Sequence, residues 1–188
     1  MPEKQPKIFK VLNQLLNGEM QAVHLYYQAA AWSADRNLDG CMALFMGHAG
    51  EELTHMRRFL DYMIDIDCPA VFTALPAPTI PVDTVPELMR MVLEHEKKVT
   101  ANIDKAVKTA QADADHSTFE FLQWFVKEQR EEEKLYRDII RRVSVIGDGP
   151  HTLYFIDKEV GEVALAQTGP AMAVETAMEA AASGGSGA

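Results

Sequence analysis

The chain has 188 residues, 47% of them hydrophobic, which is enough for one globular domain with a sizeable core. Its 28 acidic residues outnumber 18 Lys and Arg, and the resulting net charge of -10 disfavours nonspecific nucleic-acid binding and favours the attraction of cations. Two distant cysteines, a charged N-terminus without a signal-like core and no apolar run long enough for a membrane predict a reduced, cytoplasmic protein.

The first long helix is predicted from Pro6 to about Arg36. Its apolar residues recur at alternating steps of four and three, the pattern of a helix packed against other helices. Glu19 interrupts this apolar seam, and Tyr26 lies about two turns beyond Glu19 on the same face.

A second helix is predicted from Cys41 to Ile66 after a short connection, so it should run antiparallel to the first. Glu52 and His55 occupy its apolar seam and, at a spacing of i and i+3, leave the same face. A buried carboxylate is costly unless it is paired, and a metal ion is a suitable partner for a glutamate and an imidazole together. His48 lies in the same seam and is interpreted as a structural residue.

The stretch from Asp67 to Asp83 contains four prolines and breaks the helical pattern. An extended connection of about 17 residues spans roughly 50 Å at about 3.1 Å per residue. A helix of about 28 residues is roughly 42 Å long. The connection can therefore cross the whole length of the bundle, and the second and third helices are predicted to be parallel.

The third helix is predicted to begin at Thr84, because Thr84-x-x-Glu87 has the pattern of a capping box, and to fade near Ala112 to Asp115. Its apolar seam is interrupted by Glu96. This third helix therefore carries a polar break similar to those of the first two.

The fourth helix is predicted to start at a second capping box, Ser117-x-x-Glu120, and to stop at residues 147–150, Gly-Asp-Gly-Pro. Gln129 and Glu132 interrupt its apolar seam at a spacing of i and i+3.

A shorter fifth helix is predicted from His151 to about Gln167. Residues 1–167 are therefore assigned to one domain, and residues 168–188 to a low-complexity tail rich in Ala and Gly, to which no function is assigned. The predicted fold is all-α, a four-helix bundle with a long crossover between helices two and three and a short fifth helix.

The polar breaks all lie near the middle of their helices, so we expect them to converge at one level of the bundle. They are Glu19, Glu52, His55, Glu96, Gln129 and Glu132. Buried carboxylates would repel one another, and two divalent cations would neutralise them. Oxygen-rich ligation with one imidazole suits iron or manganese and admits zinc. In this hypothesis Glu52 bridges the two ions.

Two interpretations stay open at the edge of this cluster. Tyr26 is either a core aromatic or a residue that hydrogen-bonds a ligand or donates an electron. Glu51, Glu128 and Glu131 point about 100° away from the seam, where acidic residues usually form a solvated face. Their matched arrangement on two helices also fits an additional cation site, whereas Glu133 is assigned to the solvated face.

The chain resembles the non-haem bacterial ferritins over roughly residues 6–167. The resemblance is carried by EELTHM at 51–56, FLQWF at 121–125, EQREEEK at 128–134 and LYFIDKE at 153–159. It implies a ferroxidase centre that oxidises Fe(II) with dioxygen or peroxide, and a homo-oligomeric shell of twenty-four chains that stores ferric mineral. The residues that match the family's di-iron centre are Glu19, Tyr26, Glu52, His55, Glu96, Gln129 and Glu132. Those that match a third iron site are Glu51, Glu128 and Glu131.

The chain also departs from related families. Haem-containing bacterioferritins have a second Glu-x-x-His motif, where this chain has Gln129-x-x-Glu132, and a haem-ligating Met where this chain has Leu53. We therefore expect iron without haem. Phe119 and Leu122 stand where animal ferritins place acidic residues that line the iron entry pore, so these pore residues are not matched here and the entry route is left open.

Two other functions compete with iron storage. A di-iron oxidase or peroxide-consuming enzyme on the same bundle would need a substrate cavity and would have no use for the fifth helix. A DNA-binding protective shell is disfavoured by the net charge of -10 and by the lack of a basic tail. Neither nucleic acid nor a membrane is expected as a partner.

Overall fold

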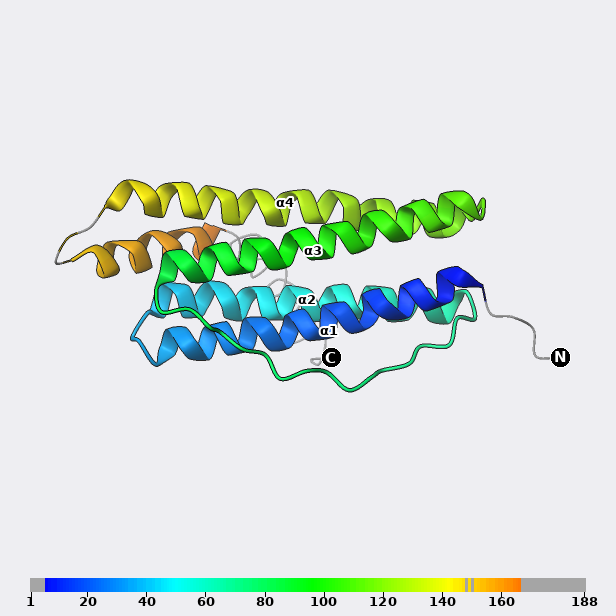
Figure 1. Ribbon diagram of the computed structural model, residues 1–188, viewed down its shortest axis with the longest axis horizontal. Helices are drawn as coiled ribbons and strands as arrows, with labels where there is room; N and C mark the ends of the chain where they lie inside the picture. The colour runs from blue at the N-terminus through cyan, green and yellow to red at the C-terminus, as the bar shows by residue number, and fades with distance from the viewer. Residues whose placement is uncertain (1–5, 148, 150, 167–188) are drawn as a thin grey trace, which may run out of the picture.

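Four long helices and one shorter helix make up the described part of the chain, residues 6–147, 149 and 151–166 of a computed structural model (Figure 1). The long helices are α1 (Lys7–Ala34), α2 (Asp39–Asp65), α3 (Val85–Ala112) and α4 (His116–Ile146). The shorter one, here called the C-terminal helix, covers residues 152–166. The predicted all-α bundle of four long helices and a short fifth helix is confirmed, and the predicted tail from 168 to 188 lies outside the described residues.

The long helices form two antiparallel pairs, with α1 packed against α2 and α3 against α4 (Figure 1). Short turns connect the helices of each pair, and each turn contains one residue with a positive φ, Asn37 at 55° and Ala114 at 52°. The pairs are joined side by side mainly through α1 and α3. No helix among the described residues is both long enough and apolar enough to cross a lipid bilayer.

The crossover between α2 and α3, residues 66–84, runs along the outside of the bundle from one end to the other (Figure 1). This path makes α2 and α3 parallel, as predicted. Two asparagines of α1 anchor the crossover: Asn13 accepts from the Val71 N–H at 2.7 Å, and Asn17 donates to the Val71 carbonyl at 2.8 Å. Asn17 also accepts from the N–H of Thr73 at 2.8 Å.

The structure confirms the residue predicted to cap the start of α3 but not the residue predicted to cap the start of α4. The hydroxyl of Thr84 accepts the Glu87 N–H, and the Glu87 carboxylate accepts the Thr84 N–H, which is the predicted capping box. The predicted capping box at Ser117 is wrong, because the carboxylate of Asp115 accepts the Thr118 N–H at 3.0 Å and starts α4. Ser117 therefore lies inside the first turn.

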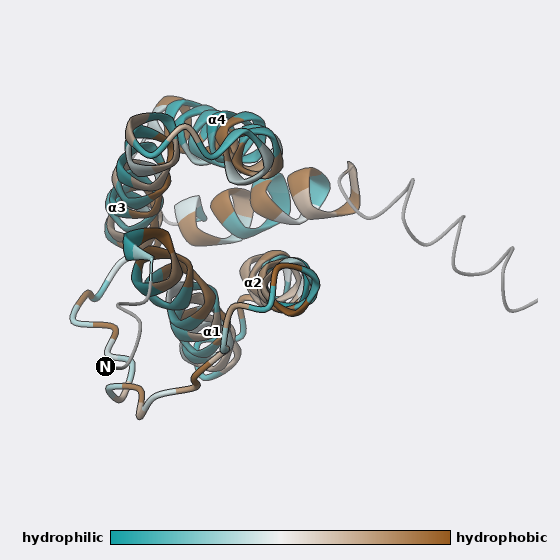
Figure 2. Cartoon of the chain, turned by 90° about the vertical axis from the view of Figure 1, so that its right-hand side faces the viewer, coloured by the Kyte–Doolittle hydropathy of each residue, from teal (hydrophilic) through white to brown (hydrophobic). Residues whose placement is uncertain are grey.

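The C-terminal helix lies between α2 and α4 (Figure 2). The Asp157 carboxylate accepts the backbone N–H groups of Gly40, at 3.0 Å, and of Cys41, at 2.8 Å, so it caps the start of α2. The helices also approach closely: a Cβ atom on Gly40 would lie 2.1 Å from the Asp157 carbonyl oxygen, and one on Gly161 would lie 3.1 Å from the Gly40 Cα. Gly40 is therefore needed for this packing, and Gly161 makes a tight contact with it.

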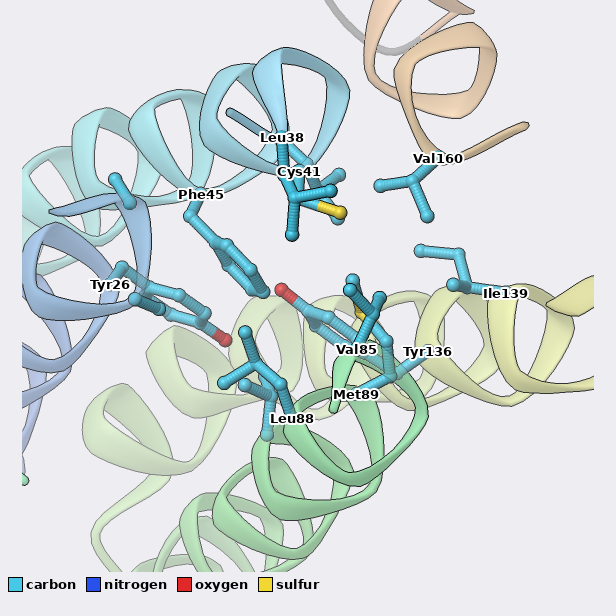
Figure 3. Close-up of a cluster of buried hydrophobic side chains, with 14 of the residues drawn as sticks. Tyr26, Leu38, Cys41, Phe45, Val85, Leu88, Met89, Tyr136, Ile139 and Val160 are labelled. Carbon is cyan, nitrogen blue, oxygen red and sulfur yellow. The ribbon is translucent and has the colours of Figure 1, made fainter. Parts of the chain in front are cut away.

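The apolar core is divided into two clusters along the bundle. The cluster at the end where the C-terminal helix docks (Figure 3) includes Leu38, Phe45, Leu88, Ile139 and Val160. The cluster at the opposite end includes Leu12, Phe59, Ile103, Leu122 and Phe125. In each long helix a short polar stretch lies between its contributions to the two clusters.

Candidate metal centre

Six buried polar residues occupy the level between the two apolar clusters, and together they are called the polar cluster here. Their exposed fractions are 3% for Glu19, 2% for Glu52, 4% for His55, 0% for Glu96, 2% for Gln129 and 5% for Glu132. They come from all four long helices and are the six residues at which the apolar seams break. The structure brings them to one level of the bundle, while their role as metal ligands stays a prediction.

Three of these residues offer ligand atoms close to one another. One atom each from Glu19, Glu52 and His55 lies within 4.8 Å of the other two. The Nδ1 atom of His55 is 3.2 Å from Oε2 of Glu52, one turn earlier on α2. Two oxygen donors and one imidazole at this spacing are suited to a single divalent cation.

The α3 and α4 side of the polar cluster is held by hydroxyl groups. The hydroxyl of Tyr26, fully buried on α1, donates a hydrogen bond to Oε1 of Glu96, which fixes this carboxylate across the bundle. The other oxygen, Oε2 of Glu96, is buried and has no hydrogen-bond partner among the described residues. Gln129 accepts from the hydroxyl of Thr100 at 3.2 Å. An unsatisfied buried oxygen is costly, and a bound cation would satisfy it.

His48 contributes to this region in a way that the sequence interpretation missed. Its Nδ1 atom lies 3.4 Å from Oε2 of Glu132 and 4.0 Å from Oε2 of Glu51. Together, His48, Glu51 and Glu132 form a second set of possible ligand atoms within 4.8 Å of one another. The sequence does place His48 one turn before Glu52 in the same seam, which could have suggested a role beside the polar cluster. Its contact with Glu132, however, depends on the rotation of α2 and α4 about their own axes.

The three residues matched to an additional iron site lie at the surface beside the polar cluster. Their side chains are exposed by 47% for Glu51, 28% for Glu128 and 63% for Glu131. No group of three ligand atoms within 4.8 Å joins them among the described residues, and Glu131 pairs with Lys127 at 3.7 Å. These carboxylates nevertheless interact electrostatically. Burial raises the pKa of Glu128, and the negative charges of Glu131 and Glu51 raise it further.

Most carboxylates of the polar cluster bind protons more tightly than usual. Burial, followed by the negative charge of Glu52, raises the pKa of Glu19 and of Glu132 well above its ordinary value. The same two causes raise the pKa of Glu96 to about 8, although the hydrogen bond from Tyr26 acts in the opposite direction. A cation that enters this site would displace the protons.

Glu52 and His55 behave differently from their neighbours. Burial alone would raise the pKa of Glu52, but hydrogen bonds from His55 and Glu19 outweigh it and lower the pKa. Burial alone would lower the pKa of His55, but the hydrogen bond to Glu52 and the surrounding carboxylates raise it. Glu52 is therefore the carboxylate of the polar cluster that ionises most readily. Its charge acts on Glu19 in the first helical pair and on Glu96 and Glu132 in the second.

The polar cluster contains no Lys or Arg. Among the described residues, no Lys or Arg forms an ion pair with Glu19, Glu52, Glu96 or Glu132; the imidazole of His48 lies near Glu132 and that of His55 near Glu52. Ionising all four carboxylates in this interior would be strongly unfavourable without added positive charge. The arrangement is chemically suited to bind two divalent cations.

Comparison with known proteins connects this arrangement to iron proteins. Residues 9–146 match a protein-family model described as a ferritin-like domain. The chain is 36% identical over 156 residues to the bacterial non-haem ferritin of Escherichia coli O6:H1, covering 83% of this chain and 94% of that one. It is 32% identical over 161 residues to the bacterial non-haem ferritin of Campylobacter jejuni, covering 86% and 96%.

Solved structures show the same similarity in three dimensions. An open-pore ferritin from Archaeoglobus fulgidus superimposes with a TM-score of 0.80 at 30% identity, covering 84% of this chain and 96% of that one. A ferritin from Chlorobium tepidum superimposes with a TM-score of 0.74 at 34% identity, covering 85% and 99%. The agreement extends over the helical bundle that carries the polar cluster.

Proposed function

This chain belongs to the ferritin family, and on that premise we propose that it is a ferroxidase that oxidises Fe(II) and stores the ferric product. One observation carries the proposal: four buried carboxylates and His55 meet at one level of the bundle, without a Lys or Arg among the described residues to neutralise them. Iron ions as substrate would supply the missing positive charge.

The ligands divide between two iron ions. Glu19 and His55 bind one Fe(II), Glu96 and Glu132 bind the other, and Glu52 bridges them. Gln129 lies beside the second ion. Support comes from the close group of Glu19, Glu52 and His55 and from the unsatisfied oxygen of Glu96. The protein's part is to hold these groups in place, whereas the redox chemistry belongs to the iron.

Dioxygen, or peroxide in its place, is the oxidant. The two Fe(II) ions each give up one electron, and Tyr26 supplies a further electron while its proton passes to Glu96, the acceptor of its hydrogen bond. The oxidised iron then leaves the centre, and Glu51, Glu128 and Glu131 form an additional iron site on its path. This proposal places no haem in the protein.

We place the protein in the cytoplasm as a homo-oligomeric shell of about twenty-four chains, as the family resemblance implies, with mineral in its interior. The C-terminal helix supports assembly because it keeps Tyr154, Phe155 and Leu165 exposed on a single chain. Exposed apolar side chains close together are typical of a surface that another chain covers.

The deciding experiment is the amount of iron retained per chain. Excess Fe(II) is added in air to the metal-free protein, the mixture is separated on a sizing column, and iron and protein are measured in the same peak. Many iron atoms per chain in a large particle are the expected result. Two or three per chain would instead indicate a di-iron enzyme, and none would mean that the polar cluster is structural.

A further inference from the structure

A second buried tyrosine, Tyr136, faces the polar cluster from α4. Its side chain is fully buried, and its ring centroid lies 5.4 Å from that of His48, which in turn lies 5.3 Å from that of Tyr26. Figure 3 shows the hydroxyl groups of Tyr26 and Tyr136 pointing into the same space between the helices. Tyr136 also stands one turn after Glu132. Its phenol therefore lies beside the reacting groups, although no step described so far uses it.

The surroundings of Tyr136 do not explain why this residue carries a hydroxyl. It belongs to an apolar cluster with Phe45 and Leu88 (Figure 3), where a phenylalanine would fill nearly the same space. Among the described residues, its hydroxyl makes no hydrogen bond of ordinary geometry to an apolar-cluster neighbour, and its one polar interaction of this kind is with the hydroxyl of Tyr26. Burying a hydroxyl without a hydrogen bond of good geometry is costly, so stability alone favours its absence.

The hydroxyl of Tyr136 has a redox-active neighbour, the phenol of Tyr26. Tyr26 is hydrogen-bonded to Glu96, so its proton already has an acceptor when the phenol is oxidised. Tyr136 has no such acceptor and instead faces Tyr26 (Figure 3). Tyr26 is therefore suited to be oxidised first. Tyr136 is suited to return an electron and a proton to Tyr26 afterwards.

We propose that Tyr136 is a hydrogen-atom donor that returns Tyr26 to its phenol form after Tyr26 has given an electron to the reaction with dioxygen. The inference rests on the proposed function. The O–H bond of Tyr136 breaks and an O–H bond forms on the oxygen of Tyr26. One proton and one electron move together, and the unpaired electron passes to Tyr136. Tyr26 is then able to donate again.

The electrons of a complete reaction balance. Reduction of one dioxygen to two water molecules takes four electrons and four protons. Two Fe(II) ions supply two electrons, and the two tyrosines supply one electron and one proton each. The remaining two protons come from solvent. A further Fe(II) ion later reduces each tyrosyl radical, and one solvent proton then restores each phenol.

The test is the identity of the radical that forms in the full-length protein. Two Fe(II) ions per chain are mixed with dissolved oxygen, the reaction is frozen within milliseconds, and electron paramagnetic resonance spectra are recorded. Wild type, Tyr136→Phe and Tyr26→Phe are compared, with Tyr27→Phe as matched control because the Tyr27 side chain is 46% exposed. Fe(II) oxidation is followed by absorbance in the same samples.

In Tyr136→Phe we expect loss of one component of the wild-type radical spectrum, because the unpaired electron can no longer pass from Tyr26 to residue 136. In Tyr26→Phe both components should be lost, since Tyr136 is oxidised only through Tyr26. Tyr27→Phe should match the wild type. Identical radical spectra in wild type and Tyr136→Phe, with iron oxidised in both, would overturn this inference alone.

Ring-deuterated tyrosine supplies a second measurement that leaves the fold unchanged. Deuteration should narrow the wild-type signal, and a spectrum that it does not alter would exclude a tyrosyl radical and contradict the role of Tyr136. A wild-type protein that does not oxidise Fe(II) at all would instead contradict the proposed function.

Discussion

The Nδ1 atom of His55 lies 3.2 Å from Oε2 of Glu52, one turn earlier on the same helix. The contact joins a histidine whose pKa is raised to a glutamate whose pKa is lowered, so the two side chains share a proton in the metal-free protein. A cation bound among Glu19, Glu52 and His55 takes the place of that proton. Metal binding should therefore release protons, and it should weaken as the pH falls.

Replacing Glu52 with Ala removes the carboxylate that the proposed function places between the two iron ions. We expect the fast phase of Fe(II) oxidation to slow by at least about tenfold, the scale seen when groups that support a metal site are lost. The helices should persist, because Glu52 contributes charge repulsion rather than apolar packing to the interior. Stopped-flow absorbance measures the oxidation, and far-ultraviolet circular dichroism measures the helix content.

The matched control is Glu94→Ala, which removes an exposed carboxylate on α3, two residues before Glu96 and paired with Lys97. It should oxidise Fe(II) at the wild-type rate. Glu132→Ala should behave like Glu52→Ala. Fast oxidation that survived in both Glu52→Ala and Glu132→Ala would show that the metal centre lies elsewhere.

The metal-free protein should become less stable as the pH rises from about 5.5 to about 7.5. The pKa of Glu96 is about 8 in the folded protein against an ordinary value of 4.5. Between these values the folded protein holds a proton that the unfolded chain has released, so its free energy of unfolding falls with increasing pH. Glu19, Glu132 and His55 act in the same direction, since their pKa values are also raised.

Urea unfolding of the metal-free protein at the two pH values measures this slope. Glu96→Gln keeps the size of the side chain without the charge, so it should flatten the pH dependence and raise stability at the higher pH. A divalent cation should restore stability to the wild type at that pH. A wild-type protein more stable at pH 7.5 than at pH 5.5 would contradict the proposed electrostatics.

Gly40→Ala should loosen the C-terminal helix. The added Cβ atom would lie 2.1 Å from the Asp157 carbonyl oxygen, so the backbones must separate. We expect a loss of about 1–3 kcal/mol in the free energy of unfolding, the usual cost of overpacking. Gly47→Ala on the same helix has no atom within 4 Å of its new Cβ and should instead stabilise by about 0.5–1 kcal/mol. Chemical denaturation of both variants checks the contrast, and equal stabilities would contradict the close approach.

The start of α4 gives a test of which residue caps the helix. Asp115→Ala should cost about 1 kcal/mol, because the Thr118 N–H loses its acceptor. Ser117→Ala should change stability by less than about 0.5 kcal/mol, since this side chain accepts no capping hydrogen bond. Thermal unfolding ranks the two variants, and a larger effect of Ser117→Ala would reverse the assignment.

The sequence predicted the fold well because the buried helices repeat their apolar residues with a regular period. The same regularity made Glu19 and Glu96 visible as exceptions, so the members of the polar cluster were found by position. His48 and Tyr136 were overlooked, because an imidazole or a phenol in an apolar seam is compatible with an ordinary core. Their contacts depend on the rotation of α2 and α4 about their own axes, which one sequence does not specify.

The error at Ser117 has a different origin. Asp115 and Ser117 are both good cap residues, and both precede an apolar helical pattern. The choice between them depends on the turn before the helix, where Ala114 has a φ of 52°. A positive φ at an alanine carries no sequence signal, so local propensity could not identify which residue begins α4.

The division of the bundle into two helical pairs determines when, during synthesis of the chain, the polar cluster can become complete. The first pair carries Glu19, Glu52 and His55, and the second carries Glu96 and Glu132. During synthesis the first pair is finished well before the second. A growing chain therefore holds only half of the polar cluster until the second pair is made. Under the proposed function, Fe(II) oxidation would begin only after the two halves meet, when the chain is complete enough to enclose the reaction.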